Sequence, residues 1–98
     1  MIILAKVTAI GSLQTITFDR TDGSKGSLKK IEVFLKGEFN EMVCEATGPL
    51  AEDIEENKLL SNTLYACDIN IALRSWVGKE SQQQVYKNTV TLNKIEPV

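Results

Sequence analysis

The sequence predicts a mainly β protein: a five-stranded Greek-key barrel with one short α-helix between its third and fourth strands. Three observations lead to this fold class. Five segments show strand-like patterns, the first of them changes phase at a glycine, and an acidic amphipathic stretch separates the third segment from the fourth. With 98 residues, 43% of them hydrophobic, the chain is long enough for one core, and we expect a single domain over residues 1–98.

The first segment, Ile2 to Phe18, is too long for one flat strand. Before Gly11 the positions expected to face the core are odd, and they are Ile3, Ala5, Val7 and Ala9. After Gly11 the bulky apolar residues, Ile16 and Phe18, fall on even positions. A change of parity at a glycine is typical of a β-bulge or a sharp bend. A long first strand bent in this way is common in small closed barrels.

The next two strands are predicted over residues 28–36 and 39–47, after a polar loop at residues 19–26. Their alternation points one set of side chains inward: Ile31, Val33, Leu35, Met42, Cys44 and Ala46. Phe34 falls on the outward face between two lysines. There it either packs under a loop or a partner subunit, or offers a stacking platform for bases.

A short helix is predicted over residues 50–60. Pro49 suits the first position of a helix, and the carboxylates at residues 52–53 would lie in the first turn, where they oppose the positive end of the helix dipole. Leu50 and Ile54 are four residues apart, so their side chains could together close one end of a barrel. We interpret the acidic run as a solvated helix face.

The last two strands are predicted at residues 63–77 and 85–95, joined by a polar tip at residues 78–84. In the first of them one face is apolar and is expected to point inward: Tyr65, Cys67, Ile69, Ile71 and Leu73. Trp76 is the only tryptophan of the chain, and it sits where this strand should leave the core. We expect function to reside in this hairpin.

The residue inventory excludes several function classes. The chain has no histidine, which removes Ser-His-Asp and Cys-His arrangements and histidine-based metal sites. Cys44 and Cys67 have no metal-binding spacing, and we expect both to be buried, reduced thiols. We therefore expect no enzymatic activity, no metal and no cofactor. No apolar run approaches the roughly 20 residues of a membrane span, and no leader pattern is present, so a cytoplasmic location without a membrane partner is expected.

The net charge of −2 does not exclude a nucleic-acid ligand. Residues 49–58 carry a net charge of −3, which leaves +1 for the rest of the chain. Residues 19–30 and residues 74–87 each carry +2. A chain that is acidic overall can therefore present a basic face.

Three stretches resemble a known family. They are Asp-Ile-Asn-Ile at residues 68–71, Arg-Ser-Trp-Val-Gly at residues 74–78 and Asn-Lys-Ile-Glu at residues 93–96, with Lys29-Lys30 in the second strand. Together they are similar to a family of short bacterial OB-fold proteins of unknown function, related to single-stranded-DNA-binding proteins. The resemblance covers roughly residues 27–96 and implies an OB-fold barrel.

The chain differs from that family at three places. Ser61-Asn62 replaces a Gly-Asp turn before the fourth strand, and Ser75 and Val77 replace Glu and Asn in the tryptophan motif. Residues 82–84 are all glutamine where the family has aromatic residues, which leaves Tyr86 as the aromatic of this segment.

Two functions remain open. The first is a single-stranded nucleic-acid-binding module, with DNA as the expected ligand, because OB-folds bind through the face of strands two and three and through the loops joining strands one to two and four to five. The residues expected to contact nucleic acid are Arg20, Lys25, Lys29, Lys30, Phe34, Lys36, Arg74, Trp76, Lys79, Tyr86 and Lys87. The second is a protein-interaction or assembly barrel, in which the same aromatic residues are buried between the subunits of a homo-oligomer.

Overall fold

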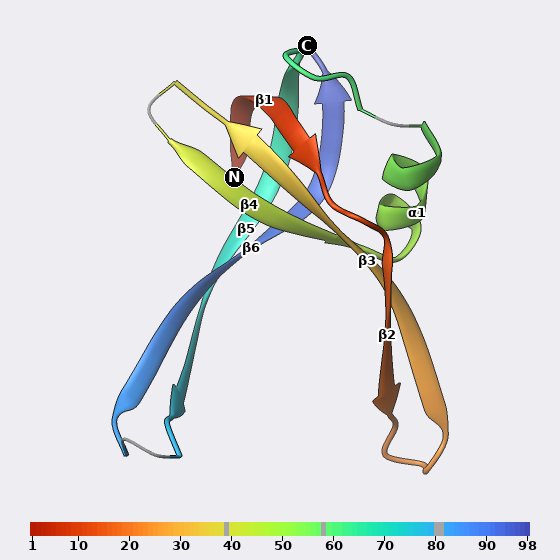
Figure 1. The fold of residues 1–98 in the computed structure, drawn as a ribbon, viewed down its shortest axis with the longest axis vertical. Helices are drawn as coiled ribbons and strands as arrows, with labels where there is room; N and C mark the ends of the chain where they lie inside the picture. The colour runs from red at the N-terminus through yellow and green to blue at the C-terminus, as the bar shows by residue number, and fades with distance from the viewer. Residues whose placement is uncertain (39, 58, 80–81) are drawn as a thin grey trace.

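The computed structural model describes residues 1–38, 40–57, 59–79 and 82–98, and for Arg74 and Trp76 it describes the backbone alone. In the described residues, six strands and one helix follow one another (Figure 1). They are β1 (Ile2–Ile10), β2 (Gln14–Asp19), β3 (Lys25–Lys36), β4 (Glu41–Thr47), α1 (Gly48–Asn57), β5 (Leu64–Val77) and β6 (Gln84–Pro97). No helix in the described part of the chain is long and apolar enough to cross a membrane.

The strands form a closed barrel. Their order in the sheet is β1-β5-β6-β4-β3-β2, and β1 also pairs with β3, which closes a ring of five strands. All pairings are antiparallel except the contact of β4 with β6, where Glu45 lies opposite Thr91. This is the strand order of an OB-like Greek-key barrel, so the predicted fold class is confirmed. β2 continues the path of β1 beyond the ring and pairs with β3 alone.

The core lies inside this ring and below α1. Its buried side chains are Ala5, Val7, Ile31, Val33, Leu35, Cys44, Ala46, Ala51, Ile54, Tyr65, Cys67, Ile69 and Leu92. The inward positions predicted for β3 and β4 are confirmed, with Met42 half-buried at the margin. Tyr65 is buried, and its hydroxyl accepts a hydrogen bond from the Leu60 amide at 3.0 Å.

The predicted bend in the first strand is confirmed at Gly11, but the change of parity begins earlier. The register of β1 against β3 shifts between Val7 and Ala9, and Ala9 then pairs with Phe34 on the outer face. The prediction that Ala9 faces the core is therefore wrong. Ala9 is exposed, whereas Ile10 packs against the core. A bulge of this kind turns one strand face over to the other. The Gly11 amide then donates to the Glu32 carbonyl at 2.8 Å, and the strand resumes as β2.

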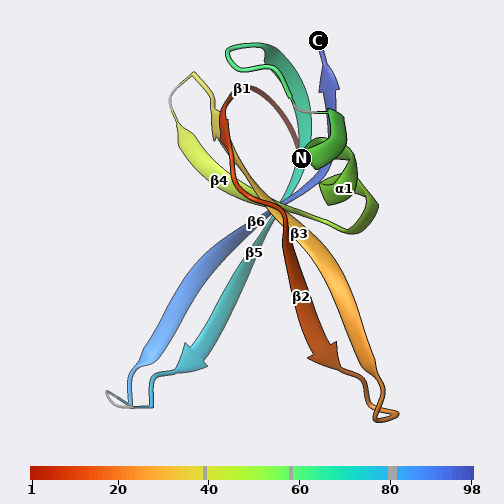
Figure 2. The ribbon, with the colours of Figure 1, turned by 45° about the vertical axis from the view of Figure 1, so that its right-hand side comes forward.

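Two hairpin arms extend beyond the barrel, and Figures 1 and 2 show them diverging on the same side of it. The first arm consists of β2 and residues 25–30 of β3; the second consists of residues 70–77 of β5 and 84–91 of β6. β3 begins at Lys25 and not at Leu28 as predicted, because its first residues pair with β2 rather than with the barrel.

The prediction that the apolar face of β5 is buried along the whole strand is wrong in the second arm. Ile69 is only 1% exposed, whereas Ile71, two residues further on the same face, is 55% exposed, and Leu73 is exposed as well. β1 provides the reason. Ile2 pairs with Asp68, and the Ile69 amide donates to the Met1 carbonyl, so β5 has no β1 neighbour beyond this point.

The helix α1 covers one opening of the barrel, as predicted, but spans residues 48–57 rather than 50–60. Gly48 has a φ of +62°, which favours glycine, and Pro49 follows where its missing amide proton costs nothing. Because the helix begins early, the acidic residues predicted for its first turn lie in the next one. Ile54 is buried and Leu50 packs against the core.

The two thiols are free and fully buried, as predicted. Burial raises the pKa of the Cys44 thiol to about 12, with the neighbouring Cys67 adding to the shift, and burial raises the pKa of Cys67 too. At pH 8 both sulfurs are therefore protonated, and the thiolate is the form that reacts. We expect neither cysteine to react with a disulfide reagent until the protein unfolds. The check compares thiol release in native and denaturing buffer; rapid native labelling of either residue would contradict it.

Candidate nucleic-acid interface

The two faces of the first arm differ in chemistry. Cross-strand pairing sets Ile16 opposite Leu28 and Phe18 opposite Gly26 on one face, which we call the groove face of this arm. The other face pairs Thr15 with Lys29, Thr17 with Ser27 and Asp19 with Lys25. Ile16, Leu28 and Phe18 are all exposed, so the groove face presents an apolar surface to solvent.

Phe18 lies over the glycine that faces it. A Cβ atom at Gly26 would lie 2.5 Å from two carbons of the Phe18 ring, so only glycine allows the ring to take this position. The guanidinium carbon of Arg20 lies 5.8 Å from the ring centroid, which is a cation–π distance. Phe18 therefore combines a ring that lies on Gly26 with a neighbouring positive charge, and it is still 45% exposed.

The turn that closes this arm is held by Asp22. Its carboxylate accepts hydrogen bonds from the Ser24 amide at 2.9 Å and the Ser24 hydroxyl at 2.6 Å, and these bonds lower the pKa of Asp22. Gly23 supplies the positive φ of +88° that the turn requires. This turn therefore holds the end of the first arm, next to Arg20.

The second arm presents a different groove face. Its cross-strand pairs are Asn70 with Thr91, Ala72 with Thr89, Arg74 with Lys87 and Trp76 with Val85. Residues directly opposite each other share a face, so this face carries Lys87 together with Asn70, Thr89 and Thr91. The sequence prediction for Arg74 and Trp76 concerns side chains that lie outside the described part of the structure; their backbone belongs to β5.

The two groove faces meet at the bases of the arms. A groove of about 470 Å³ lies there, lined by Ile16, Leu28, Lys30, Glu45, Thr47, Lys87 and Thr89. Ile16 and Leu28 come from the first arm and Lys87 and Thr89 from the second. Lys30 lies where the first arm joins the barrel, and Glu45 and Thr47 come from β4. The groove therefore brings an apolar wall and a basic wall together over the barrel face.

The groove floor is close to neutral. Lys30 forms a salt bridge with Glu45 at 2.8 Å. Glu32 pairs with Glu45 across β3 and β4 and lines a smaller cavity beside the groove, so a second carboxylate lies next to the floor. Lys87 is the cation of the opposite wall, and within the described residues it has no ion-pair partner. An anion in the groove would therefore meet positive charge on the arms and not on the floor.

Phe34 lies further along the same barrel face. It pairs with Val43, and the two line a shallow cavity of about 380 Å³ together with Lys36 and Glu41, whose charged groups are 3.9 Å apart. Phe34 is partly exposed, as predicted from its outward position. The barrel face beyond the groove is thus mixed apolar and charged.

The eleven residues predicted to contact nucleic acid do not all share one surface. Lys30 and Lys87 line the groove, while Arg20 and Lys79 lie at or near the arm tips. Lys25, Lys29 and Tyr86 lie on the opposite faces of their arms, where Lys25 pairs with Asp19 at 3.3 Å and Lys29 donates to the Thr15 hydroxyl at 2.7 Å.

The apolar wall of the groove was missed by the sequence analysis. Ile16 and Phe18 alternate with polar residues as in a half-buried strand, and the sequence identifies them only as the bulky apolar positions after Gly11. Gly26 falls within the predicted loop at residues 19–26, so its pairing with Phe18 has no signal in the predicted strands.

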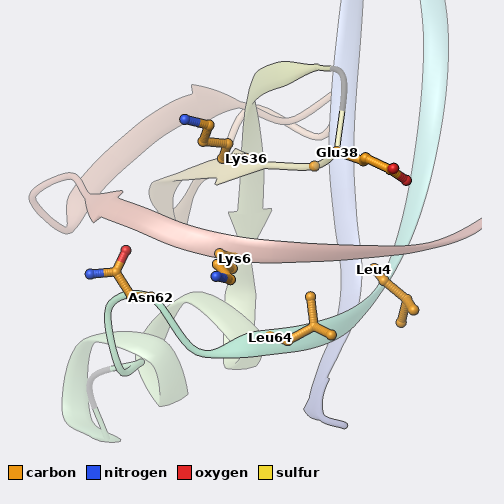
Figure 3. A pocket seen from close by; sticks show the side chains of 7 residues that line it. Leu4, Lys6, Lys36, Glu38, Asn62 and Leu64 are labelled. Atoms are coloured by element: carbon orange, nitrogen blue, oxygen red, sulfur yellow. The ribbon is translucent and has the colours of Figure 1, made fainter.

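A second cavity, of about 490 Å³, lies at the other end of the barrel strands (Figure 3). It is lined by Leu4, Lys6, Lys36, Gly37, Glu38, Asn62 and Leu64. Lys6 pairs with Lys36 on one side and with Leu64 on the other. The described residues contain no group of three or more acidic or cysteine side chains that could hold a metal ion there or elsewhere.

Comparisons with protein-family models and with curated proteins found no match for this chain.

Proposed function

We propose that this chain binds single-stranded nucleic acid, with single-stranded DNA as its ligand, in the groove between the two arms. The observation that carries the proposal is the groove itself, in which the apolar wall of Ile16 and Leu28 faces the basic wall of Lys87 over the outer face of β3 and β4. Proteins that bind single strands combine cationic groups that follow the phosphates with apolar or aromatic side chains on which bases stack.

The chemistry of the apolar wall favours a single strand over a duplex. Exposed Phe18 extends this wall toward the tip of the first arm. In a duplex the base faces are stacked on one another and cannot cover such a surface, whereas unpaired bases can. The choice of DNA rests on the resemblance to a family of unknown function that is related to single-stranded-DNA-binding proteins. Two free thiols fit the reducing cytoplasm that such a role implies.

The carboxylates at and beside the groove floor determine where the phosphates run. Glu32 and Glu45 repel phosphate, and the Lys30 salt bridge offsets only one of them. The bases would therefore lie toward the apolar wall, and the phosphates along the cations of the arms.

A titration with single-stranded oligothymidine at about 50 mM salt tests the proposal. Trp76 belongs to the second arm and is the only tryptophan, so its emission reports on the site without a label. We expect saturable binding, seen in that emission and in a gel shift, and much weaker binding to a duplex of equal length. If saturating oligothymidine changes neither signal, or the duplex binds equally well, the proposal fails.

The salt dependence of binding should identify the cation that meets phosphate. For single strands each neutralised phosphate contributes a slope of about −0.7 to the logarithm of the binding constant against the logarithm of salt concentration. Lys87→Ala should make the slope shallower by about that amount. Lys29→Ala is the matched control, because Lys29 lies on the opposite face of its arm, and should leave the slope unchanged. Equal slopes for the wild type and Lys87→Ala would show that Lys87 does not contact a phosphate.

A further inference from the structure

The two arms carry different kinds of side chains on the faces that point away from the groove. On the first arm that face consists of threonine, serine, aspartate and lysine residues, as expected for a ribbon surrounded by water. On the second arm it consists of the pairs Ile71–Val90, Leu73–Asn88, Ser75–Tyr86 and Val77–Gln84, and we call these eight residues the back face. The back face carries no charged residue at all.

The back face is exposed over most of its length, whereas Val90, at its barrel end, is half-buried and packs against the core. Leu73 is 65% and Tyr86 is 64% exposed, and Ile71 and Val77 are similar. These four side chains leave on the order of 400 Å² of largely apolar surface in water, as much as the largest patch on a typical monomer. A two-stranded ribbon is at best marginally stable alone, and it gains stability when its apolar face is covered. The polar first arm shows that this fold does not require an apolar back.

We propose that the back face binds the back face of a second copy of this chain, so that two protomers join through their second arms. In a two-fold contact each surface meets itself, and any charge would meet a like charge. The absence of charge removes that repulsion. It also argues against the two other occupants of an exposed ribbon, since nucleic acid and anionic membranes are both attracted by lysine and arginine.

The contact between two back faces is small, which limits its strength. Two back faces would bury on the order of 1,000 Å², the lower end of the range for specific interfaces, so the dimer should be weak, with a dissociation constant in the micromolar range. The groove face of the same arm, with Lys87 and Thr89, points the other way and remains free. The dimer would therefore carry two grooves on opposite sides, and the inference does not depend on what the grooves bind.

Sedimentation equilibrium from about 0.1 to 200 µM tests the proposal, since this range brackets a micromolar constant. The mass should rise from 10.9 kDa toward twice that value. Leu73→Glu should weaken association by about 100-fold or more, because it buries unpaired carboxylates at the contact. Leu60→Glu is the matched control, because Leu60 is an equally exposed leucine (67%) outside the back face, and it should dimerise like the wild type.

A loss of dimer could also follow from a disordered arm, so two further measurements keep the test decisive. At about 0.1 µM, where the wild type is also monomeric, Leu73→Glu should retain the wild-type Trp76 emission and unfolding midpoint. Tyr86→Ser, a milder change on the same face, should weaken the dimer at least about tenfold. A wild type that stays monomeric at 200 µM, or a dimer that Leu73→Glu and Tyr86→Ser leave intact, overturns the proposal.

Discussion

Phe18→Ala should weaken the binding of single-stranded oligothymidine by roughly 10- to 100-fold. Stacking of a base on an aromatic side chain contributes about 1–3 kcal/mol, and Phe18 is the exposed ring of the apolar groove wall. Its ring is already held against Gly26 and beside Arg20, so little conformational freedom is lost on binding. Trp76→Ala is expected to cause a loss of the same size. Fluorescence anisotropy of a labelled oligomer measures both.

Tyr86→Ala is the matched control for Phe18→Ala. Both residues are exposed aromatics on an arm, but Tyr86 belongs to the back face of its arm and Phe18 to a groove face. With protein kept below about 0.1 µM, where a micromolar dimer has dissociated, Tyr86→Ala should leave affinity unchanged. If the two variants lose affinity equally, the ligand does not distinguish the two faces, and the groove is not the site.

Ile54→Ala should lower the free energy of unfolding by about 2–5 kcal/mol, a large part of the stability of a domain of this size. Ile54 is 2% exposed and comes from α1, the helix that covers one opening of the barrel. Removing its side chain leaves a cavity between the helix and the strands, and a rigid barrel cannot collapse to fill it. Urea denaturation followed by circular dichroism gives the value.

Ile71→Ala provides the comparison, since it makes the same chemical change at a residue that the sequence analysis also predicted to be buried. Because Ile71 is more than half exposed, the monomer should lose no more than about 0.5 kcal/mol. The measurement is made at low protein concentration, so that any contact between back faces does not contribute. A loss at Ile71 as large as that at Ile54 would mean that the second arm packs against the barrel.

The sequence by itself determined the barrel and most of its interior. Alternation identified the inward residues of β3 and β4, the parity change located the bend of the first strand near Gly11, and Pro49 marked the start of the helix. These features are local, because they depend on the pleat of a strand and the geometry of one helical turn. The basic residues of the arms were also identified, although not the faces on which they lie.

Only the tertiary structure decided where the barrel ends and the arms begin. Ile69 and Ile71 have the same side chain and the same parity on β5, yet one is buried and the other exposed. The difference comes from β1, which reaches Ile69 through the Met1 carbonyl and goes no further. Ile16 and Leu28 became a groove wall for a similar reason, since the pairing of β3 with β4 stops at Lys30. Alternation separates the two faces of a strand, but burial depends on which neighbouring strands extend far enough to cover them.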